Sequence, residues 1–397
     1  MSTILVAHPS PDLYGSDRQL LETIRALVDA GHRVNAALPD DGPLRPELEA
    51  LGARVAIVPF TVLRKSLMSP RGLAGLVARS GGEIARLRGL IKANDADLVL
   101  VNTVTLPWWA PAGRAAGVPV LAHVHEAEDT QNLLVRTGLN APLLAASRVV
   151  VNSQAARDTL VRAQPPLKRR TKVVHNGVPA PQDPPPPLRQ RLPQAAFRIA
   201  MVARLSPRKG VDVALEALGH LRADGLNASL RLCGSVFPGY EWYEEQLRER
   251  AARPDLAGHV ELLGYVHPTW PVLYAADAVV VPSRVEPFGN TAVEAMHAER
   301  PLVASRAQGL AEVVTDGVTG LLVEPDSPRA LADALLSLAA DPGRARTLAR
   351  TARREAAKRF GVERYCTAMV EVVEDLLSDV LPLTTTVRTE STFTSNN

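Results

Sequence analysis

Short apolar runs alternate with amphipathic stretches along this chain, and the alternation starts again after a proline-rich segment. Ile4–Ala7, for example, is followed by Arg18–Ala30, in which Leu20, Ile24 and Leu27 share one helical face. Alternating strands and helices are typical of a parallel sheet covered by helices on both faces. The sequence therefore predicts an α/β protein built from two units of this kind.

The proline-rich stretch from Pro179 to Pro193 separates the two units. Such a run forms neither a helix nor a central strand and behaves as a semi-rigid spacer. We predict two doubly wound, Rossmann-like domains that face each other across a cleft. The predicted divisions are a first domain at 1–178, a hinge at 179–195, a second domain at 196–360, a helix at 361–380 that packs back across the hinge, and a disordered tail at 381–397. Strands are expected at Ile4–Ala7, Val34–Leu38, Val55–Val58, Leu98–Val101, Val118–Ala122, Val149–Asn152, Lys172–His175, Phe197–Val202, Ser229–Cys233, Val260–Leu263, Ala278–Val281 and Leu302–Ala304.

The composition indicates a globular protein of a reducing compartment. Of its 397 residues, 46% are hydrophobic and 22% are charged, and the two cysteines, Cys233 and Cys366, indicate no disulfide framework. Residues Ser2–His8 resemble a first strand rather than a secretion signal, and no apolar run reaches the roughly 18 residues that span a bilayer. We expect a cytoplasmic protein that is soluble or rests peripherally on the cytoplasmic membrane face.

Two stretches concentrate basic side chains, although the net charge is only +3. Residues 64–92 and residues 157–172 each contain several Lys and Arg residues but a single acid, Glu83 in one and Asp158 in the other. Basic clusters of this kind hold proteins to anionic lipid, and an ordinary solvated basic face is an equally good interpretation. Nucleic acid is not an expected partner, because no recognition motif accompanies the charge.

The segment from Glu286 to Met296 carries the strongest functional pattern. It follows the apolar run Ala278–Val281, so Glu286 is expected in the loop at a strand's carboxyl end and Glu294 in the first turns of the next helix. Ligands of open α/β sheets bind at this edge. The helix N-terminus offers backbone N–H groups to a phosphate or polyhydroxyl ligand, from Phe288, Gly289, Asn290 and Thr291. Together these features predict a sugar-nucleotide site.

A cationic motif, Arg204 to Gly210, follows the first expected strand of the second domain. Arg204 ends that strand, and Lys209 stands near the start of the next helix. Two cations beside a helix N-terminus can clamp a diphosphate, because charge-assisted hydrogen bonds add to the field of the helix. A basic pair in a loop is by itself more often solvated surface, but this pair is expected at the same sheet edge as Glu286 and Glu294.

Arg204 and Lys209, together with the Glu-x7-Glu spacing of Glu286 and Glu294, resemble the family 4 retaining glycosyltransferases of the GT-B fold, which belong to the glycosyl transferases group 1. The resemblance covers nearly the whole chain. Further matching motifs are Asn176–Val178, Gly264–Val266 and Asp316–Leu322. The resemblance implies a first domain on the acceptor side and a second domain that binds the nucleotide sugar.

The resemblance also implies roles for single residues. Arg204 and Lys209 would neutralise the pyrophosphate of the donor. Glu294 would accept hydrogen bonds from the ribose hydroxyls, and Glu286 would hold hydroxyls of the donor sugar. The backbone amides of residues 288–291 would contact sugar and phosphate. Taken alone, the glutamates have a less favoured alternative interpretation, in which one is a charge at a helix N-terminus and the other an exposed loop acid.

In the first domain, His125 matches the donor-contacting histidine of the family. It follows an expected strand at the corresponding sheet edge and precedes an acid, Glu126. A histidine there can hydrogen-bond a sugar hydroxyl near the reacting carbon. His123, inside or at the end of the strand, is expected to be structural.

Gly15 matches the glycine-rich turn of the family only in part, because Ser16 stands where a second glycine is usual. Glycine allows close approach of the backbone to phosphate or acceptor. If Ser16 needs a positive φ, the local geometry differs from that of the family. An ordinary turn that caps the following helix is the alternative.

The resemblance implies a retaining transfer of sugar from a nucleoside-diphosphate sugar to a hydroxyl of a saccharide or lipid-linked acceptor, in polysaccharide or glycoconjugate biosynthesis. The expected catalytic residues are His125, Glu286, Arg204 and Lys209. No metal or other cofactor is expected, because no cluster has ligand spacing and the cations can stabilise the departing diphosphate. Two alternatives remain open, a sugar-nucleotide epimerase of the same fold and a non-catalytic, sugar-nucleotide-binding partner subunit.

Overall fold

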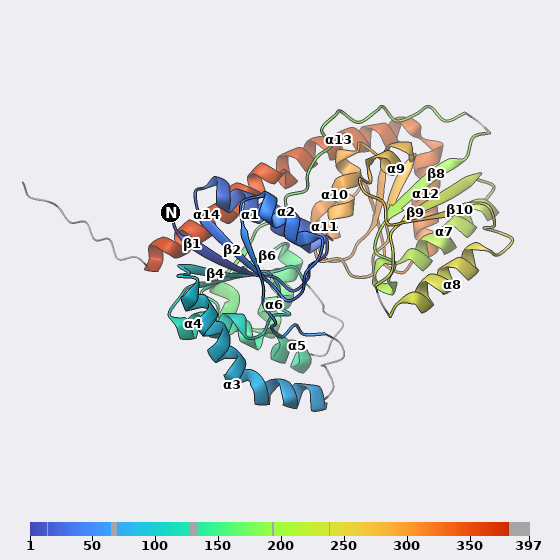
Figure 1. The fold of residues 1–397 in the computed structure, drawn as a ribbon. Coiled ribbons are helices and arrows are strands. Elements are labelled where there is room, and N and C mark those ends of the chain that lie inside the picture. Colours follow the sequence, from blue (N-terminus) through green and yellow to red (C-terminus); the bar gives the residue numbers. More distant parts are fainter. Residues whose placement is uncertain (14, 65–69, 127–132, 193, 238, 381–397) are drawn as a thin grey trace, which may run out of the picture.

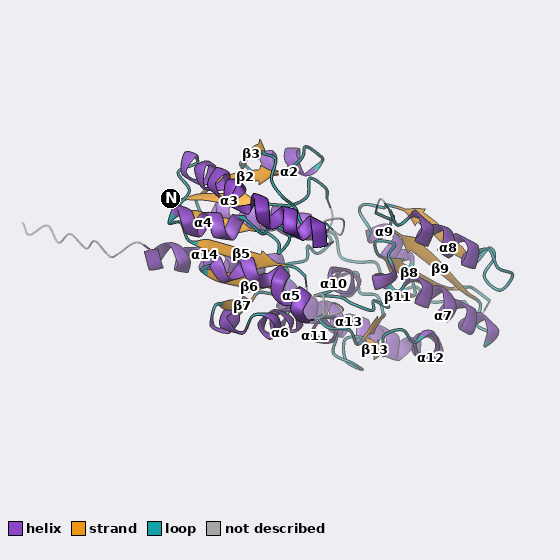
Figure 2. Cartoon of the chain, turned by 90° about the horizontal axis from the view of Figure 1, so that it is seen from below, coloured by secondary structure: helices purple, strands orange, loops and turns teal. Residues whose placement is uncertain are grey.

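The chain forms two parallel β-sheets, each with its own helices (Figures 1 and 2). The structure, a computed structural model, describes residues 1–380 except 14, 65–69, 127–132, 193 and 238. The first sheet is built from strands of the N-terminal half, and the second from strands that follow the proline-rich segment. The tail predicted at 381–397 lies outside the described residues.

The first sheet has the strand order β3-β2-β1-β4-β5-β6-β7, and all of its pairs are parallel. The order reverses between β1 and β4, and the carboxyl ends of strands at such a point create a crevice for ligands. The strands are β1 (Thr3–Ala7), β2 (Arg33–Leu38), β3 (Arg54–Ile57), β4 (Leu98–Val101), β5 (Val120–Val124), β6 (Arg148–Val151) and β7 (Thr171–Val173). The helices between them are α1 (Gly15–Asp29), α2 (Leu44–Ala50), α3 (Pro70–Ala93), α4 (Trp109–Ala116), α5 (Leu133–Asn140) and α6 (Gln154–Ala163).

The second sheet, also parallel, has the order β10-β9-β8-β11-β12-β13 and reverses between β8 and β11. Its strands are β8 (Phe197–Val202), β9 (Ala228–Cys233), β10 (Val260–Gly264), β11 (Ala278–Val281), β12 (Leu302–Ser305) and β13 (Leu321–Val323). Its helices are α7 (Val211–Ala223), α8 (Glu241–Ala251), α9 (Trp270–Ala275), α10 (Asn290–His297), α11 (Leu310–Val313), α12 (Pro328–Ala340) and α13 (Pro342–Phe360).

Each sheet is buried between two layers of helices. One face of the first sheet packs against α1 and α14 (Val362–Val380) through residues such as Leu20 and Met369, and the other against α3 and α4 through Leu87 and Trp109. The second sheet carries α7, α8 and α12 on one face and α9, α10 and α11 on the other. Burial on both faces explains why the central strands are apolar throughout.

The C-terminal helices join the two halves a second time. Helix α13 packs against α10, whereas α14 lies on the first half, where the Tyr365 hydroxyl is 2.5 Å from the Thr23 hydroxyl. Gly177, just before the proline-rich segment, lies against this helix, since a Cβ there would be 2.7 Å from the Cβ of Tyr365 and 2.9 Å from the Cα of Val362. The halves are therefore linked by the proline-rich segment and by the junction of α13 with α14.

All the predicted strands are present, with small shifts at their ends. The largest shift places β5 at Val120–Val124 rather than Val118–Ala122, so that His123 lies inside the strand and His125 directly follows it. Strand β13 (Leu321–Val323) was not predicted, because its three residues are too short a run to distinguish from a loop.

The substitution Met369→Ala is expected to destabilise the protein by about 2–5 kcal/mol, because it removes a fully buried side chain between α14 and the first sheet. Glu374→Ala, at an exposed position of the same helix, is the matched control and should change the free energy of unfolding by less than about 0.5 kcal/mol. Urea unfolding followed by circular dichroism measures both. Equal effects of the two substitutions would contradict the packing of α14 on the first sheet.

Candidate active site

Two loops meet at the centre of the carboxyl edge of the second sheet. The loop after β8 contains a 3₁₀ turn at Pro207–Lys209, and the backbone N–H of Arg284, in the loop after β11, donates to the Arg208 carbonyl at 2.8 Å. Gly210 permits this approach, because a Cβ at its φ of 67° would lie 2.1 Å from the carbonyl oxygen of Pro282. These loops carry the predicted cationic motif and the first of the two predicted glutamates.

The Arg284 side chain fixes the shape of the cationic loop. Its guanidinium donates to the Pro207 carbonyl at 2.6 Å and to the two carboxylate oxygens of Asp212 at 2.9 and 2.6 Å. Asp212, in the first turn of α7, also accepts from the Tyr243 hydroxyl at 2.7 Å. Sequence reasoning missed Arg284. The available signal was its place just after a buried strand, two residues before Glu286.

Lys209 and Glu286 form a largely buried ion pair. The Lys209 Nζ lies 2.5 Å from the Glu286 Oε2, which also accepts from the Ser283 hydroxyl at 3.1 Å. Burial alone would raise the pKa of Glu286, but Lys209, Arg208 and the two hydrogen bonds outweigh it and hold that pKa below its usual value. Burial lowers the pKa of Lys209, and Glu286 offsets only part of this effect. The pair thus keeps Glu286 ionised.

Arg204 stands at the end of β8, close enough to Lys209 for its charge to lower the Lys209 pKa, although burial is the larger cause. Its guanidinium carbon is 3.0 Å from the centre of the Phe237 ring, which holds the cation by a cation–π contact. The structure therefore brings Arg204, Lys209 and Glu286 together at one point of the sheet edge, as the sequence pattern predicted.

The N-terminus of α10 lies in the same loop as Glu286. Gly289 precedes this helix with a φ of 111°, and α10 begins at Asn290. The Phe288 side chain is buried, with its ring 5.4 Å from that of Phe360, so only its backbone is placed to face a ligand. Asn290 also contacts the first half, where its Oδ1 accepts from the Asn176 amide at 2.9 Å. Thr291, in the first turn of α10, is partly buried.

Glu294, further along α10, is partly buried and lies near a cation of the first half. Burial raises the pKa of Glu294 to about 7, and the nearby Arg18 opposes this shift. Arg18 also donates to the Tyr265 hydroxyl at 3.1 Å. Sequence reasoning did not give Arg18 a role in the site, because it appeared only as the first residue of an expected helix.

His125, directly after β5, ends a chain of hydrogen bonds in the first half. The His125 Nε2 is 3.0 Å from the Asn102 Oδ1, and the Asn102 Nδ2 is 3.0 Å from the His8 Nδ1. The His8 Nε2 in turn lies 2.8 Å from the Asp17 Oδ1. Burial lowers the pKa of His125 to about 3, with His8 adding to the shift and Asp17 opposing it. His125 is therefore neutral near pH 7.

The neighbours of His125 have separate contacts. Glu126 accepts from the Thr103 hydroxyl at 2.6 Å and from the backbone N–H of His125 at 3.0 Å, so its carboxylate does not pair with the imidazole. His123 is fully buried, with its ring 4.0 Å from that of His125. Burial lowers its pKa well below the usual value, so it is a neutral core residue.

Gly15 and Ser16 lie in the first turn of α1, and a Cβ at Gly15 would be 3.7 Å from the Asn290 Nδ2. Ser16 does not have a positive φ, so the condition under which its local geometry would differ from that of the family is not met. The non-glycine residues with positive φ include Glu299 and Gln308, at 53° and 42°.

A carboxylate of the second half caps a helix of the first. Glu312, on α11, accepts from the backbone N–H groups of Gln154 and Ala155 at 2.8 and 2.7 Å. The same carboxylate lies 3.4 Å from the His175 Nε2. This contact adds to Arg18–Tyr265 and Asn176–Asn290, so the edges of the two sheets that carry the site residues face each other.

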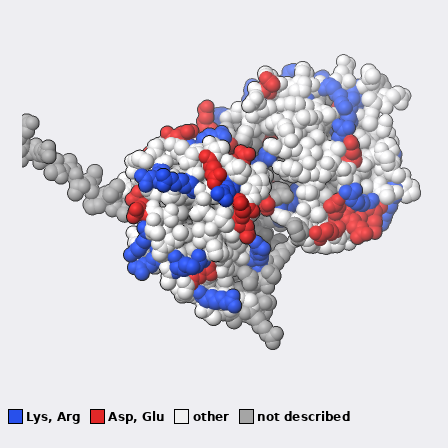
Figure 3. All heavy atoms as spheres, viewed as in Figure 1, with Lys and Arg blue, Asp and Glu red and all other residues white. Residues whose placement is uncertain are grey.

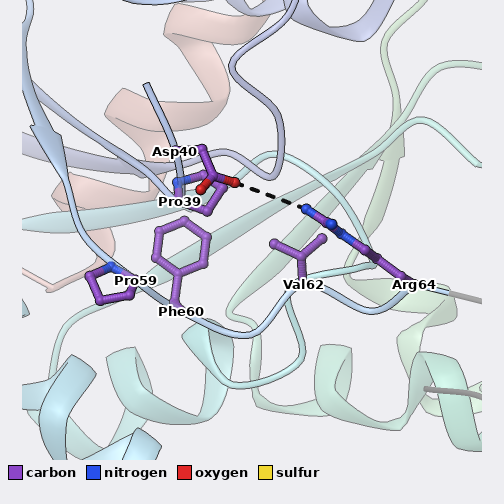
Figure 4. Close-up of a pocket in the computed structure, with 6 residues that line it drawn as sticks. All are labelled: Pro39, Asp40, Pro59, Phe60, Val62 and Arg64. Carbon is purple, nitrogen blue, oxygen red and sulfur yellow. Dashed lines mark ion pairs between the residues drawn. The ribbon is translucent and has the colours of Figure 1, made fainter. Parts of the chain in front are cut away.

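A hollow of about 250 Å³ lies at the carboxyl edge of the first sheet, beyond β2 and β3 (Figure 4). Phe60 forms part of its apolar wall, and Asp40 and Arg64 approach each other across it at 4.0 Å. In the part of the chain that the structure describes, no three His, Cys, Asp or Glu side chains gather as a metal site would require. Nor is any described helix both long and apolar enough to cross a bilayer.

Comparison with known proteins shows the family of this chain. Residues 189–355 match the family model described as glycosyl transferases group 1, and residues 14–182 match the model for glycosyltransferase family 4. The chain belongs to this glycosyltransferase family, as its motifs predicted, and the predicted GT-B fold is confirmed.

The similarity to known proteins extends over most of the chain. Glycogen synthase of Mycobacterium tuberculosis is 31% identical over 70% of this chain and 63% of its own length, so the match spans less than two thirds of that relative. D-inositol 3-phosphate glycosyltransferase 1 of Catenulispora acidiphila is 29% identical over 84% of each chain. The crystal structure of Anabaena HepE with UDP and glucose has a TM-score of 0.78 and 25% identity, and covers 94% of this chain and all of HepE.

The substitution Glu294→Gln is expected to remove a pH dependence of stability. Burial raises the pKa of Glu294 from 4.5 to about 7, so the folded protein holds a proton that the unfolded chain releases in this interval. The stabilising effect of protonation is complete below about pH 4.5 and is lost as the pH rises to about 7. Relative to Glu294→Gln, the unsubstituted protein should lose about 1–3 kcal/mol between these limits.

Urea unfolding at a series of pH values measures this difference. Glu245→Gln, at an exposed position of α8, is the matched control and should leave the pH profile unchanged. A constant difference between Glu294→Gln and the unsubstituted protein across the interval would contradict the burial argument.

Proposed function

We propose that this protein is a retaining glycosyltransferase that moves a sugar from a nucleoside-diphosphate sugar to a hydroxyl of a saccharide or lipid-linked acceptor. The observation that carries the proposal is the convergence of Arg204, Lys209 and Glu286 at the N-terminus of α10, in a chain of this family. The named relatives, a glycogen synthase and an inositol-phosphate glycosyltransferase, also transfer sugars. Polysaccharide or glycoconjugate biosynthesis is the proposed setting, in the cytoplasm.

The donor diphosphate binds Arg204 and Lys209 in this proposal. Both cations, together with the backbone N–H groups of residues 288–291 at the α10 N-terminus, oppose the charge that the leaving diphosphate gains. This electrostatic stabilisation needs no metal ion. Because HepE was solved with UDP and glucose, a uridine diphosphate sugar is the first donor to test.

The carboxylates hold hydroxyl groups of the donor. Glu286, kept ionised by Lys209, accepts from hydroxyls of the sugar, and Glu294 accepts from the ribose. His125 contacts the sugar from the first half, and Gly15 lets the backbone approach the donor. The acceptor hydroxyl attacks from the face that the diphosphate leaves, and the leaving phosphate takes its proton.

We propose that the two predicted domains bind different substrates. Residues 1–178 serve the acceptor and residues 196–360 the donor, while 179–195 and the helix at 361–380 allow the halves to close on the substrates. The hollow between Asp40 and Arg64 is a candidate place for part of a saccharide acceptor, because the Phe60 ring gives a sugar an apolar surface beside charged groups.

The two alternatives make different biochemical predictions. An epimerase would convert a nucleotide sugar without a second substrate, and a non-catalytic subunit would bind the donor without turnover. Both are less favoured, because the relatives named above are transferases or synthases and the charged residues of the donor site are all present.

The substitution Arg204→Ala is expected to lower donor turnover at least a hundredfold, because it removes a charge that stabilises the leaving diphosphate. Arg253→Ala, at an exposed position beyond α8, is the matched control and should retain full activity. The assay measures diphosphate release from UDP-, GDP-, ADP- and dTDP-sugars in the presence of a chelator. Full activity of a folded Arg204→Ala variant would refute the assignment of the donor site.

We also propose that the protein rests on an anionic membrane surface. On α3, the basic residues of the stretch 64–92 are exposed at Arg79, Arg86, Arg88 and Lys92, while Lys65 lies outside the described residues. The stretch 157–172 exposes Lys168 and Arg169 among others. On the face seen in Figure 3, Lys and Arg side chains gather over the part of the first half where α3 and α4 lie.

Binding to phosphatidylglycerol vesicles is expected at low salt and should be lost at high salt, since the attraction between exposed charges is screened. The double substitution Arg79→Glu and Arg88→Glu should abolish it. Arg344→Glu with Arg346→Glu, exposed on α13, is the control with the same charge change. Vesicle sedimentation measures all three proteins, and binding that resists salt or is equal in both variants would exclude this mode of attachment.

A further inference from the structure

A chain of hydrogen-bonded side chains joins Asp17 to His125 inside the first half. Asp17, His8 and Asn102 are 2%, 0% and 1% exposed, so water cannot replace their contacts. They come from the first turn of α1, the end of β1 and the end of β4. Buried polar groups of this kind are costly unless each donor meets an acceptor. That requirement fixes which group donates and which accepts in every hydrogen bond between these side chains.

Asp17 determines the direction of these hydrogen bonds. Asp17 lies in the first turn of α1, and a carboxylate accepts hydrogen bonds but donates none. The His8 Nε2, 2.8 Å from the Asp17 Oδ1, must therefore carry a proton. The Asn102 amide nitrogen faces the His8 Nδ1, and an amide nitrogen only donates, so the His8 Nδ1 carries a lone pair. The Ser16 hydroxyl also donates to the same Asp17 oxygen, at 3.3 Å.

The Asn102 amide links His8 to His125, and its orientation follows from that of His8. Its amide nitrogen donates to the His8 Nδ1 at 3.0 Å, so its oxygen faces the His125 Nε2, also at 3.0 Å. An amide oxygen only accepts, so the His125 Nε2 carries the proton. The opposite direction would place a lone pair of His8 against the Asp17 carboxylate. Asp17 thus selects one orientation of the Asn102 amide and one tautomer of His125.

The selected tautomer decides what His125 offers a ligand. Its N–H group is used on Asn102, and its Nδ1 has a lone pair. Since the imidazole is neutral near pH 7, this nitrogen can accept a hydrogen bond and cannot donate one. A hydroxyl group is the matching partner.

We propose that Asp17, acting through His8 and Asn102, is a positioning residue that fixes the tautomer of His125, so that His125 Nδ1 accepts a hydrogen bond from a hydroxyl of the donor sugar. The identity of the ligand rests on the function proposed above. The tautomer of His125 does not depend on that function. Ser16, at the position where the family usually has a second glycine, belongs to the same hydrogen-bonded chain through Asp17.

The tautomer can be measured on the ligand-free protein by NMR after histidine-selective ¹⁵N labelling. Two-bond and three-bond proton–nitrogen correlations distinguish a protonated ring nitrogen from one with a lone pair, and the His125→Gln variant assigns the signals. In the unsubstituted protein we expect His125 protonated on Nε2. Protonation on Nδ1, or an even mixture of tautomers, would overturn the proposal.

Asp17→Asn tests the origin of the preference with almost no change in size. Its amide no longer forces the proton of His8 onto Nε2, so the His125 signals should shift to a mixture of tautomers. Asp29→Asn, exposed at the other end of α1, is the matched control and should leave them unchanged. Asn102→Leu, which interrupts the chain one step later, should have the same effect as Asp17→Asn. An unchanged His125 tautomer in a folded Asp17→Asn or Asn102→Leu protein would overturn the proposal.

Kinetics separate this role from a purely structural one. With the donor that the unsubstituted protein turns over, Asp17→Asn should lower kcat roughly tenfold, the effect of losing one well-placed hydrogen bond, and leave nucleoside-diphosphate affinity unchanged. In a His125→Ala background the same substitution should have little further effect. Additive losses, or an equal loss of diphosphate affinity, would overturn the proposal. A protein with the expected tautomers but no sugar transfer would refute only the proposed function.

Discussion

The ion pair between Lys209 and Glu286 is the contact on which the donor edge of the second half depends. Its partners come from loops after β8 and β11, which the backbone joins at Arg208 and Arg284 and which Gly210 allows to touch. Buried charges are tolerated only when they are paired. A donor that set its diphosphate against Lys209 and its sugar hydroxyls against Glu286 would give both charges new partners in place of each other.

Much of the fold follows from the sequence because parallel strands covered on both faces are apolar along their whole length. The apolar runs at Leu98–Val101 and Ala278–Val281 are most clearly interpreted as buried strands, and both are strands with the predicted bounds. The place of the proposed donor residues was also predictable, because a short motif after a buried strand must lie at the carboxyl edge of the sheet. In this respect Arg204, Lys209 and Glu286 needed only local information.

The residues that were missed act through contacts distant in the sequence. His8 contacts Asn102, which is 94 residues away in the sequence, and Glu312 contacts Gln154, which is 158 residues away. No local sequence pattern indicates either pair. Strand β13 was too short to recognise. The sequence pattern also does not reveal that Glu299 and Gln308 adopt positive φ values, which are uncommon for residues other than glycine.

The division of the site between two halves explains why these distant contacts lie where they do. The charges that suit a diphosphate are in the second half, whereas the histidine chain is in the first, so neither half alone presents both. Arg18 to Tyr265, Asn176 to Asn290 and Glu312 to α6 are polar contacts, which can exchange with water more easily than a packed core. The junction of α13 and α14 would keep the halves attached if such contacts opened and closed. A site built in this way can admit its substrates when open and exclude water when closed, which a sugar transfer requires if hydrolysis of the donor is not to compete.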